Sequence, residues 1–124
     1  MKRTIANNAP AAIGPYVHAT EANSIIFTSG QIGLNPQDGK LTEGIEGQTK
    51  QTLENLKNIL ESANSDFEHV LKATIYLDDL ANFSKVNNIY KDYFNGEFSA
   101  RSAAEVSKLP MGAKVEIELI AEAK

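Results

Sequence analysis

An apolar stripe with helical spacing runs through the middle of this chain of 124 residues. Between Ile45 and Ala63, apolar or small side chains recur at steps of three and four, the pattern of an amphipathic helix with one buried face. This stripe therefore predicts a helix that covers one face of a sheet. Its members are Ile45, Thr49, Leu53, Leu56, Leu60 and Ala63.

Strand patterns flank this helix on both sides. Residues 16–20 and 24–32 are rich in β-branched and aromatic residues and predict a hairpin around Glu21-Ala22-Asn23. The turn signals Asn-Pro and Asp-Gly mark residues 35–40 as a loop. Residues 70–77 alternate, so every second side chain should share a face. Those expected on the apolar side are Leu71, Ala73, Ile75 and Leu77.

The remaining elements complete one sheet. Residues 65–68 have capping-box spacing and predict a short helical turn, and residues 82–94 predict a second helix. Two strands near 102–106 and 114–121 are separated by a turn at 109–112. The order β-β-α-β-α-β-β predicts the α/β (α+β) class, with a single mixed sheet and both helices on one face.

The second face of this sheet is polar in sequence. The last strand should turn its apolar residues towards the helices and turn Lys114, Glu116, Glu118 and Ile120 away from them. Solvation is the usual fate of a polar face in an antiparallel sheet. A subunit interface with buried polar groups is the alternative, and periodicity alone leaves both open.

Composition excludes several classes of function. The chain carries 16 acidic against 12 basic side chains, a net charge of −4, and no basic cluster. Nucleic-acid binders neutralise phosphates with clustered basic residues, so this balance disfavours them. The chain lacks cysteine, which excludes a thiol nucleophile. No signal-peptide stretch follows Met1-Lys2-Arg3, and no apolar run could span a bilayer. We expect a cytoplasmic protein that binds neither nucleic acid nor membrane.

Known catalytic motifs are missing as well. No phosphate-binding loop, HExxH or GxSxG pattern occurs. The two histidines, His18 and His69, lack metal-ligand spacing and are expected at the surface or an interface. No metal site is predicted.

Several short segments do not look like core filling. They include Gly14-Pro15-Tyr16, residues 28–32, residues 98–103 with Arg101 among small side chains, and residues 114–118. Together with residues 9–16, the 78–87 region and Leu109-Pro110, these segments closely resemble the reactive intermediate deaminase A family (RidA, also called YjgF). The resemblance covers essentially the whole chain, as one RidA-like domain over residues 1–124.

This resemblance implies a chorismate-mutase-like fold assembled as a homotrimer, with three clefts between subunits and the polar sheet face as the interface. It also implies a 2-iminobutanoate/2-iminopropanoate deaminase. Such an enzyme hydrolyses imines and enamines such as 2-aminoacrylate, which pyridoxal-phosphate-dependent Ser/Thr dehydratases release. The products are 2-oxo acids and ammonia, and no cofactor is needed.

Two residues would carry the chemistry. Arg101 would bind the substrate carboxylate, because a guanidinium matches a carboxylate bidentately. Glu116 would hold or deprotonate the attacking water. The alternative for Arg101 is a structural ion pair with Glu105 or Glu118, and the alternative for Glu116 is a solvated carboxylate on a polar strand.

Five further residues would bind substrate. Tyr16 would line the cleft or merely pack, while Ser29 and Gly30 would form a small wall or simply end a strand. Asn87 matches a polar helix position of the family. Ala103 stands where many members have cysteine, and a hydrolysis by water needs no thiol.

Two further departures from the family are Ser99 and Gly33, where many members have proline. These changes affect pocket geometry more than reaction class. Two other functions compete: a non-catalytic 2-oxo-acid-binding regulator of branched-chain amino-acid metabolism, and an endoribonuclease or translation inhibitor. The acidic composition disfavours the last of these.

Overall fold

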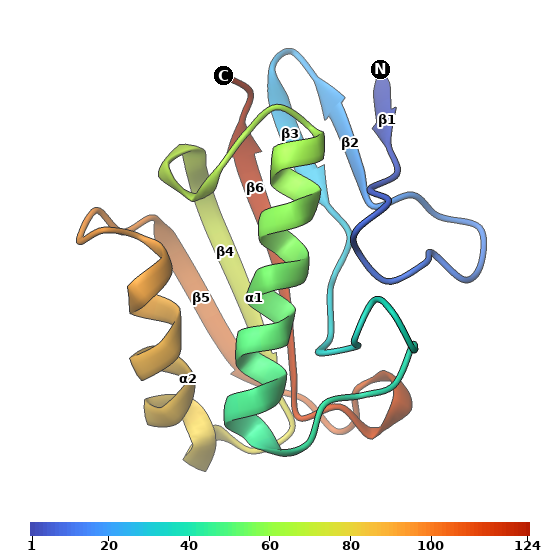
Figure 1. The fold of residues 1–124 in the computed structure, drawn as a ribbon. Helices are drawn as coiled ribbons and strands as arrows, with labels where there is room; N and C mark the ends of the chain where they lie inside the picture. Colours follow the sequence, from blue (N-terminus) through green and yellow to red (C-terminus); the bar gives the residue numbers. More distant parts are fainter.

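The computed structural model describes residues 1–124 and contains one six-stranded sheet (Figure 1). Its strand order is β1-β2-β3-β6-β4-β5. The β4 and β5 strands are parallel and every other pair is antiparallel, so the sheet is mixed as predicted. The strands are β1 (Lys2–Thr4), β2 (Ala19–Ala22), β3 (Ile25–Thr28), β4 (Val70–Leu77), β5 (Ala100–Glu105) and β6 (Val115–Glu122).

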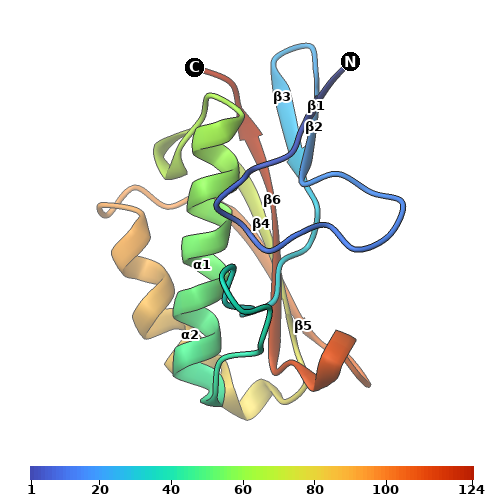
Figure 2. The ribbon, with the colours of Figure 1, turned by 45° about the vertical axis from the view of Figure 1, so that its right-hand side comes forward.

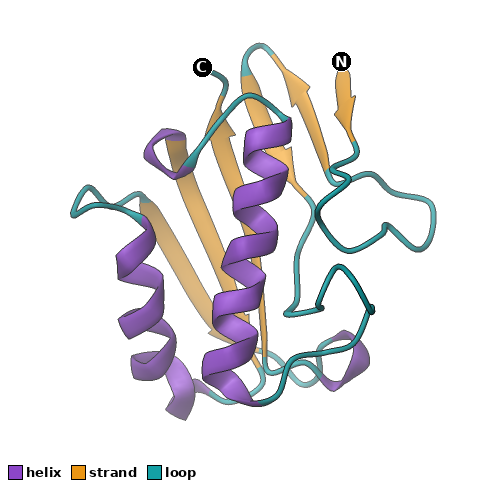
Figure 3. Ribbon diagram, in the orientation of Figure 1, coloured by secondary structure: helices purple, strands orange, loops and turns teal.

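Two α-helices cover one face of this sheet. Figure 2 shows both on the same side, which confirms the predicted layering. The longer, α1 (Gly44–Ser62), buries the predicted stripe, and α2 (Phe83–Tyr90) connects parallel neighbours β4 and β5. Short 3₁₀ turns link the elements (Figure 3): η1 (Phe67–His69), η2 (Leu80–Asn82), η3 (Lys91–Tyr93) and η4 (Pro110–Gly112).

The core lies between the sheet and the two helices. Leu53, Leu56 and Leu60 of α1 are fully buried against the central strands. In β6, Val115, Ile117 and Leu119 are buried, whereas alternate residues are only half-buried. The predicted division of this strand into two faces is therefore confirmed.

Three details of the strands differ from the sequence prediction. The short edge strand β1 was not predicted, because Lys2-Arg3-Thr4 has no apolar pattern. The β2–β3 hairpin turns at Asn23-Ser24, one residue later than predicted, and both residues have positive φ, as a tight two-residue hairpin turn requires. Leu71 is 45% exposed instead of facing the core, since an irregularity between Val70 and Lys72 gives Val70 the buried position.

Two further predictions need correction. His18 is buried at 1% exposure instead of lying at the surface: its Nδ1 accepts the Ala6 N–H at 2.9 Å, so its Nε2–H donates to the Pro10 carbonyl at 2.8 Å. A helical turn follows Ser65 as expected, but this serine caps nothing and donates its hydroxyl to the Glu122 carbonyl instead.

His69, in contrast, stays partly exposed beside Asp66. No helix in the structure has the length and apolar character that crossing a membrane would require.

Candidate functional site

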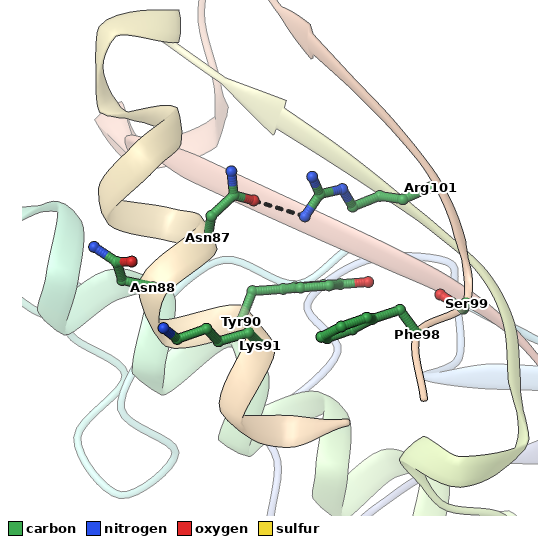
Figure 4. Close-up of a pocket in the computed structure, with 7 residues that line it drawn as sticks. All are labelled: Asn87, Asn88, Tyr90, Lys91, Phe98, Ser99 and Arg101. Atoms are coloured by element: carbon green, nitrogen blue, oxygen red, sulfur yellow. Dashed lines mark hydrogen bonds between the residues drawn. The ribbon is translucent and has the colours of Figure 1, made fainter. Parts of the chain in front are cut away.

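Arg101 lies near the start of edge strand β5, on the face of the sheet that carries the helices. It is in register with Ala73 of β4, which is fully buried under those helices. The Arg101 side chain therefore reaches towards α2, where its Nη1 donates to Asn87 Oδ1 at 2.7 Å (Figure 4). Both residues were predicted from the sequence as site residues, and in the structure they are hydrogen-bonded to each other.

The Arg101 guanidinium borders a surface hollow of about 450 Å³, called here the anion hollow. Figure 4 shows the side chains of α2 on one side of it and those of the segment entering β5 on the other. Two cations and no carboxylate contribute to its wall, so it suits a small anion. The lining residues are Asn87, Asn88, Tyr90, Lys91, Phe98, Ser99 and Arg101.

Arg101 has no carboxylate partner in the structure. The only ion pairs within 4.0 Å join Asp66 to His69 and to Lys124. Glu105 accepts a hydrogen bond from the Leu80 amide, and Glu118 accepts one from the Tyr76 hydroxyl. The alternative in which Arg101 is held by Glu105 or Glu118 is therefore wrong, and most of its five N–H donors remain free for a ligand.

Glu116 lies on the opposite face of the sheet. It is in register with Tyr76, whose side chain points away from the helices and meets Glu118 there. Its carboxyl group packs on Gly30: a Cβ built on that glycine would lie only 2.9 Å from the Glu116 carboxyl carbon. Gly30 was predicted as part of a small wall of the site, and the structure adds that its lack of a side chain makes room for Glu116.

A second hollow of about 300 Å³, called here the acid hollow, borders Glu116. Apart from this carboxylate its wall carries no charge, and it contains several exposed apolar side chains. Ile13 is 85% exposed and Met111 64%. The lining residues are Pro10, Ala11, Ile13, Tyr16, Gly30, Gln31, Ile32, Leu34, Pro110, Met111 and Glu116.

The environment of Glu116 favours its protonated form. Partial burial raises the pKa of this carboxyl above its usual range, and the negative charge of Glu118, two residues along the same strand, raises it further. A carboxyl group with a raised pKa exchanges protons closer to neutral pH, as general acid–base catalysis requires.

Within one chain, Arg101 and Glu116 do not share a cavity. Their strands are separated by β4, and the register places them three residues apart along it. Standard strand spacing puts their Cα atoms roughly 14 Å apart. Their side chains also project to opposite faces, so no small molecule could contact both in a single protomer.

Two of the remaining predicted site residues lie near Glu116. Tyr16 is 47% exposed and lines the acid hollow. Ser29 does not line it: its hydroxyl donates to the Val17 carbonyl at 2.6 Å and its amide to the His18 carbonyl at 2.9 Å. Ser29 thereby holds the backbone of the segment that follows Tyr16, so it supports the site without lining the hollow.

Ala103 lies two residues after Arg101 on the same face of β5. It is half-buried and packs against the core, and it lines neither of the two hollows. No group of three metal-ligating side chains meets anywhere in the structure.

Comparison with known proteins identifies the family. A family model described as Endoribonuclease L-PSP matches residues 6–123. A Mus musculus protein named 2-iminobutanoate/2-iminopropanoate deaminase is 49% identical over 114 residues, covering 91% of this chain and 84% of its own. The chain belongs to the reactive intermediate deaminase A family. Further relatives of 45–48% identity carry the same deaminase name.

Other RidA-family relatives match the full length of the chain. A Lactococcus lactis protein, provisionally named as the regulator AldR, is 46% identical over 100% of this chain and 99% of its own. The crystal structure of Escherichia coli TdcF with bound serine superposes with a TM-score of 0.91 at 36% identity, covering 98% of this chain and 100% of that one. The family prediction made from sequence is confirmed.

Some residues around the two hollows of this RidA-family chain were not recognised from sequence. Phe83 and Tyr90 were assigned to the buried side of the second helix, yet both contact the Arg101 guanidinium. Their spacing from Asn87 was the available signal, because residues three and four apart share a helix face. For Met111 and Ile13, the sequence contained no pattern that would have predicted a place in the acid hollow.

Proposed function

We propose that this protein is a deaminase that hydrolyses 2-imino acids such as 2-iminobutanoate and 2-iminopropanoate, together with their enamine tautomers. The main observation behind the proposal is the exposed Arg101 guanidinium, which is paired with the neutral Asn87 and no carboxylate. The deaminase name carried by relatives of 45–49% identity supports the same activity.

Arg101 binds the substrate carboxylate in this proposal. Two charge-assisted hydrogen bonds from the guanidinium would contribute about 3–6 kcal/mol of binding free energy. They hold a planar imino acid with its C2 atom in a fixed position. Lys91 lines the same hollow and adds positive charge at its rim.

The reaction then needs only water. The water oxygen bonds to C2 and the C=N double bond becomes single, which gives a carbinolamine. Collapse of this adduct restores a C=O bond and releases the nitrogen as ammonia. The two protons of the water end on the ammonia, so one imine and one water give one 2-oxo acid and one ammonia.

Glu116 transfers the proton during these reaction steps. As a carboxylate it accepts a proton from the attacking water, and as a carboxylic acid it returns the proton to the departing nitrogen. Its raised pKa brings this proton exchange closer to neutral pH than in an ordinary glutamate. The apolar wall of the acid hollow suits an uncharged alkyl side chain of the substrate.

The active site in this proposal lies between two copies of the chain. Since Arg101 and Glu116 lie on opposite faces of one sheet, a substrate that contacts both requires Arg101 from one subunit and Glu116 from the next. A closed ring of such head-to-tail contacts is a cyclic oligomer, and we propose the homotrimer implied by the family resemblance. The cytoplasmic location expected from sequence also stays a prediction.

A coupled assay tests the activity. The protein is added to a threonine dehydratase reaction and the release of 2-oxobutanoate is followed. The wild type should accelerate release, whereas Arg101→Ala and Glu116→Gln should not. Glu46→Gln, an exposed carboxylate in the first turn of α1 that lines neither hollow, is the matched control and should behave as wild type. An unchanged rate with wild type would rule the activity out.

Mixing the two inactive variants tests the shared site. If subunits of Arg101→Ala and Glu116→Gln are unfolded together and refolded as mixed trimers, a site is intact when a Glu116→Gln chain supplies Arg101 and an Arg101→Ala chain supplies Glu116. Random mixing gives about one half times one half, or one quarter, of wild-type sites. A site contained in one chain would recover no activity.

The regulator name of the Lactococcus lactis relative supports one alternative, a protein that binds 2-oxo acids without converting anything. Such a sensor needs Arg101 but not Glu116. Calorimetry with 2-oxobutanoate on Glu116→Ala, beside the activity of that variant, separates the two functions. Tight binding of 2-oxobutanoate by a wild type without activity would favour the sensor.

A further inference from the structure

Helix α2 presents one continuous stripe of side chains to Arg101. Phe83, Asn87 and Tyr90 are spaced by four and three residues, which places them on one side of the helix. All three contact the same guanidinium: Asn87 through the 2.7 Å hydrogen bond, and the two aromatic residues through the faces of their rings.

The geometry of the two rings is that of cation–π contacts. The Arg101 Cζ atom lies 5.0 Å from the Phe83 centroid and 5.0 Å from the Tyr90 centroid. A guanidinium within about 6 Å of a ring centroid is attracted by the negative face of the ring, and its flat shape also stacks well. Two rings and one amide therefore fix both the position and the tilt of the Arg101 head group.

Tyr90 is itself buried and packed on a second ring. It is 4% exposed, and its ring centroid lies 4.7 Å from that of Phe94, which is 1% exposed. In Figure 4 the Tyr90 side chain extends from α2 towards the segment that enters β5. Its hydroxyl oxygen is buried and has no hydrogen-bond partner in the chain. What Tyr90 supplies to Arg101 is therefore its ring.

We infer that Phe83 and Tyr90 are positioning residues, which hold the Arg101 guanidinium in place for an incoming carboxylate. The meaning of this inference for catalysis rests on the proposed deaminase function. Neither ring needs to touch the substrate. A free arginine side chain populates many rotamers and must lose that freedom when it binds an anion. An arginine side chain that α2 already holds in place has lost this rotamer freedom before the ligand binds.

The inference predicts a specific defect when a ring is lost. Phe83→Leu and Tyr90→Leu should each weaken binding of a 2-oxo acid and raise KM by about 5- to 20-fold, the range expected for one cation–π contact. Since the loss affects substrate and transition state alike, kcat should change less than twofold. Tyr90→Phe restores the ring and should restore KM with it.

Two measurements on the intact protein test this. Calorimetry with 2-oxobutanoate gives the affinity of wild type, the three variants and the control Tyr93→Leu, which removes a ring packed on Phe67 outside the anion hollow. Side-chain ¹⁵N relaxation of the Arg101 Nε–H gives its order parameter without any ligand. We expect a rigid Nε–H in wild type and Tyr90→Phe, and a mobile one in both leucine variants.

Different results would overturn the positioning role of the two rings and the deaminase activity. A mobile Arg101 Nε–H in wild type, or one that stays equally rigid when either ring is removed, overturns the positioning role even if the protein hydrolyses imines. A purely structural role for Tyr90 would lower the melting temperature of Tyr90→Leu and leave KM unchanged. A rigid Arg101 that loosens in both variants, in a protein without hydrolytic activity, keeps the positioning role and removes only the proposed reaction.

Discussion

The carboxyl group of Glu116 packs on Gly30 so closely that no side chain fits between them. This contact joins strand β6 to the segment that follows β3, and it fixes where the carboxylate can point. Since both residues border the acid hollow, the size of residue 30 bears directly on the chemistry.

Replacing Gly30 by alanine should therefore damage activity more than stability. The added methyl group would push the Glu116 carboxylate aside, and a misplacement of about 1 Å can reduce a rate by 10- to 100-fold. We expect kcat/KM for imine hydrolysis to decrease by about 10- to 100-fold. Gly47→Ala is the matched control, because the new methyl would meet only the side chain of Thr42, outside both hollows. Wild-type kinetics in Gly30→Ala would contradict the assigned contact.

The charge of Glu118 should contribute to the position of the acid limb of the pH–rate profile. Activity that needs ionised Glu116 is lost as the pH falls through the pKa of that group. Burial and Glu118 both raise this pKa, so the loss should begin at a higher pH than an ordinary glutamate would give. Glu118→Gln removes one of the two causes and should shift the acid limb to lower pH. The profile is measured with dehydratase in excess at every pH. A shift of the acid limb to higher pH in Glu118→Gln would refute the effect of the Glu118 charge on the pKa of Glu116.

Lysine should not replace Arg101. A lysine keeps the positive charge but lacks the planar fork of donors, so it cannot donate to Asn87 and bind a carboxylate bidentately at once. We expect Arg101→Lys to weaken binding of 2-oxobutanoate at least roughly tenfold, which corresponds to about 1.4 kcal/mol. Calorimetry measures this, with the exposed Arg3→Lys as control. Equal affinities would mean that charge alone suffices.

His18 should matter for stability. Removing its ring in His18→Ala would leave the buried Ala6 N–H and Pro10 C=O without partners, and each such group costs about 1–3 kcal/mol. We expect urea unfolding to show a loss of about 2–4 kcal/mol, and the Ala6 amide to exchange faster with solvent. His69→Ala, at a partly exposed ring, should cost less than about 1 kcal/mol.

Sequence patterns predicted the layout of the sheet and helices because apolar periodicity reports directly on burial. The alternation in residues 115–119 and the stripe along α1 are such cases. Periodicity could not foresee the irregularity at Leu71, since a one-residue shift reverses which face each side chain takes. Nor could it foresee β1, which adds to the sheet edge through backbone pairing to β2.

The candidate site was predicted only in part for a different reason. A motif specifies residue types along the chain, and Arg101, Glu116 and Asn87 were predicted as site residues from such motifs. Which face each side chain takes, and which neighbours hold it, depends on strand register and on packing between distant segments. The separation of Arg101 from Glu116 by the sheet itself is a property of register, and the contact of Tyr90 with Arg101 is a property of packing.

The two hollows also differ in how much of the chain must come together to build them. Arg101 and its Asn87 partner are 14 residues apart, within the β4-α2-β5 unit. Glu116 and Gly30, in contrast, are 116 − 30 = 86 residues apart in the sequence and meet only after β6 has inserted between β3 and β4. Closing a long loop costs more chain entropy than closing a short one, and contacts between distant segments form more slowly. During folding, we therefore expect the Arg101 guanidinium to reach its position on α2 before the Glu116 carboxylate packs on Gly30.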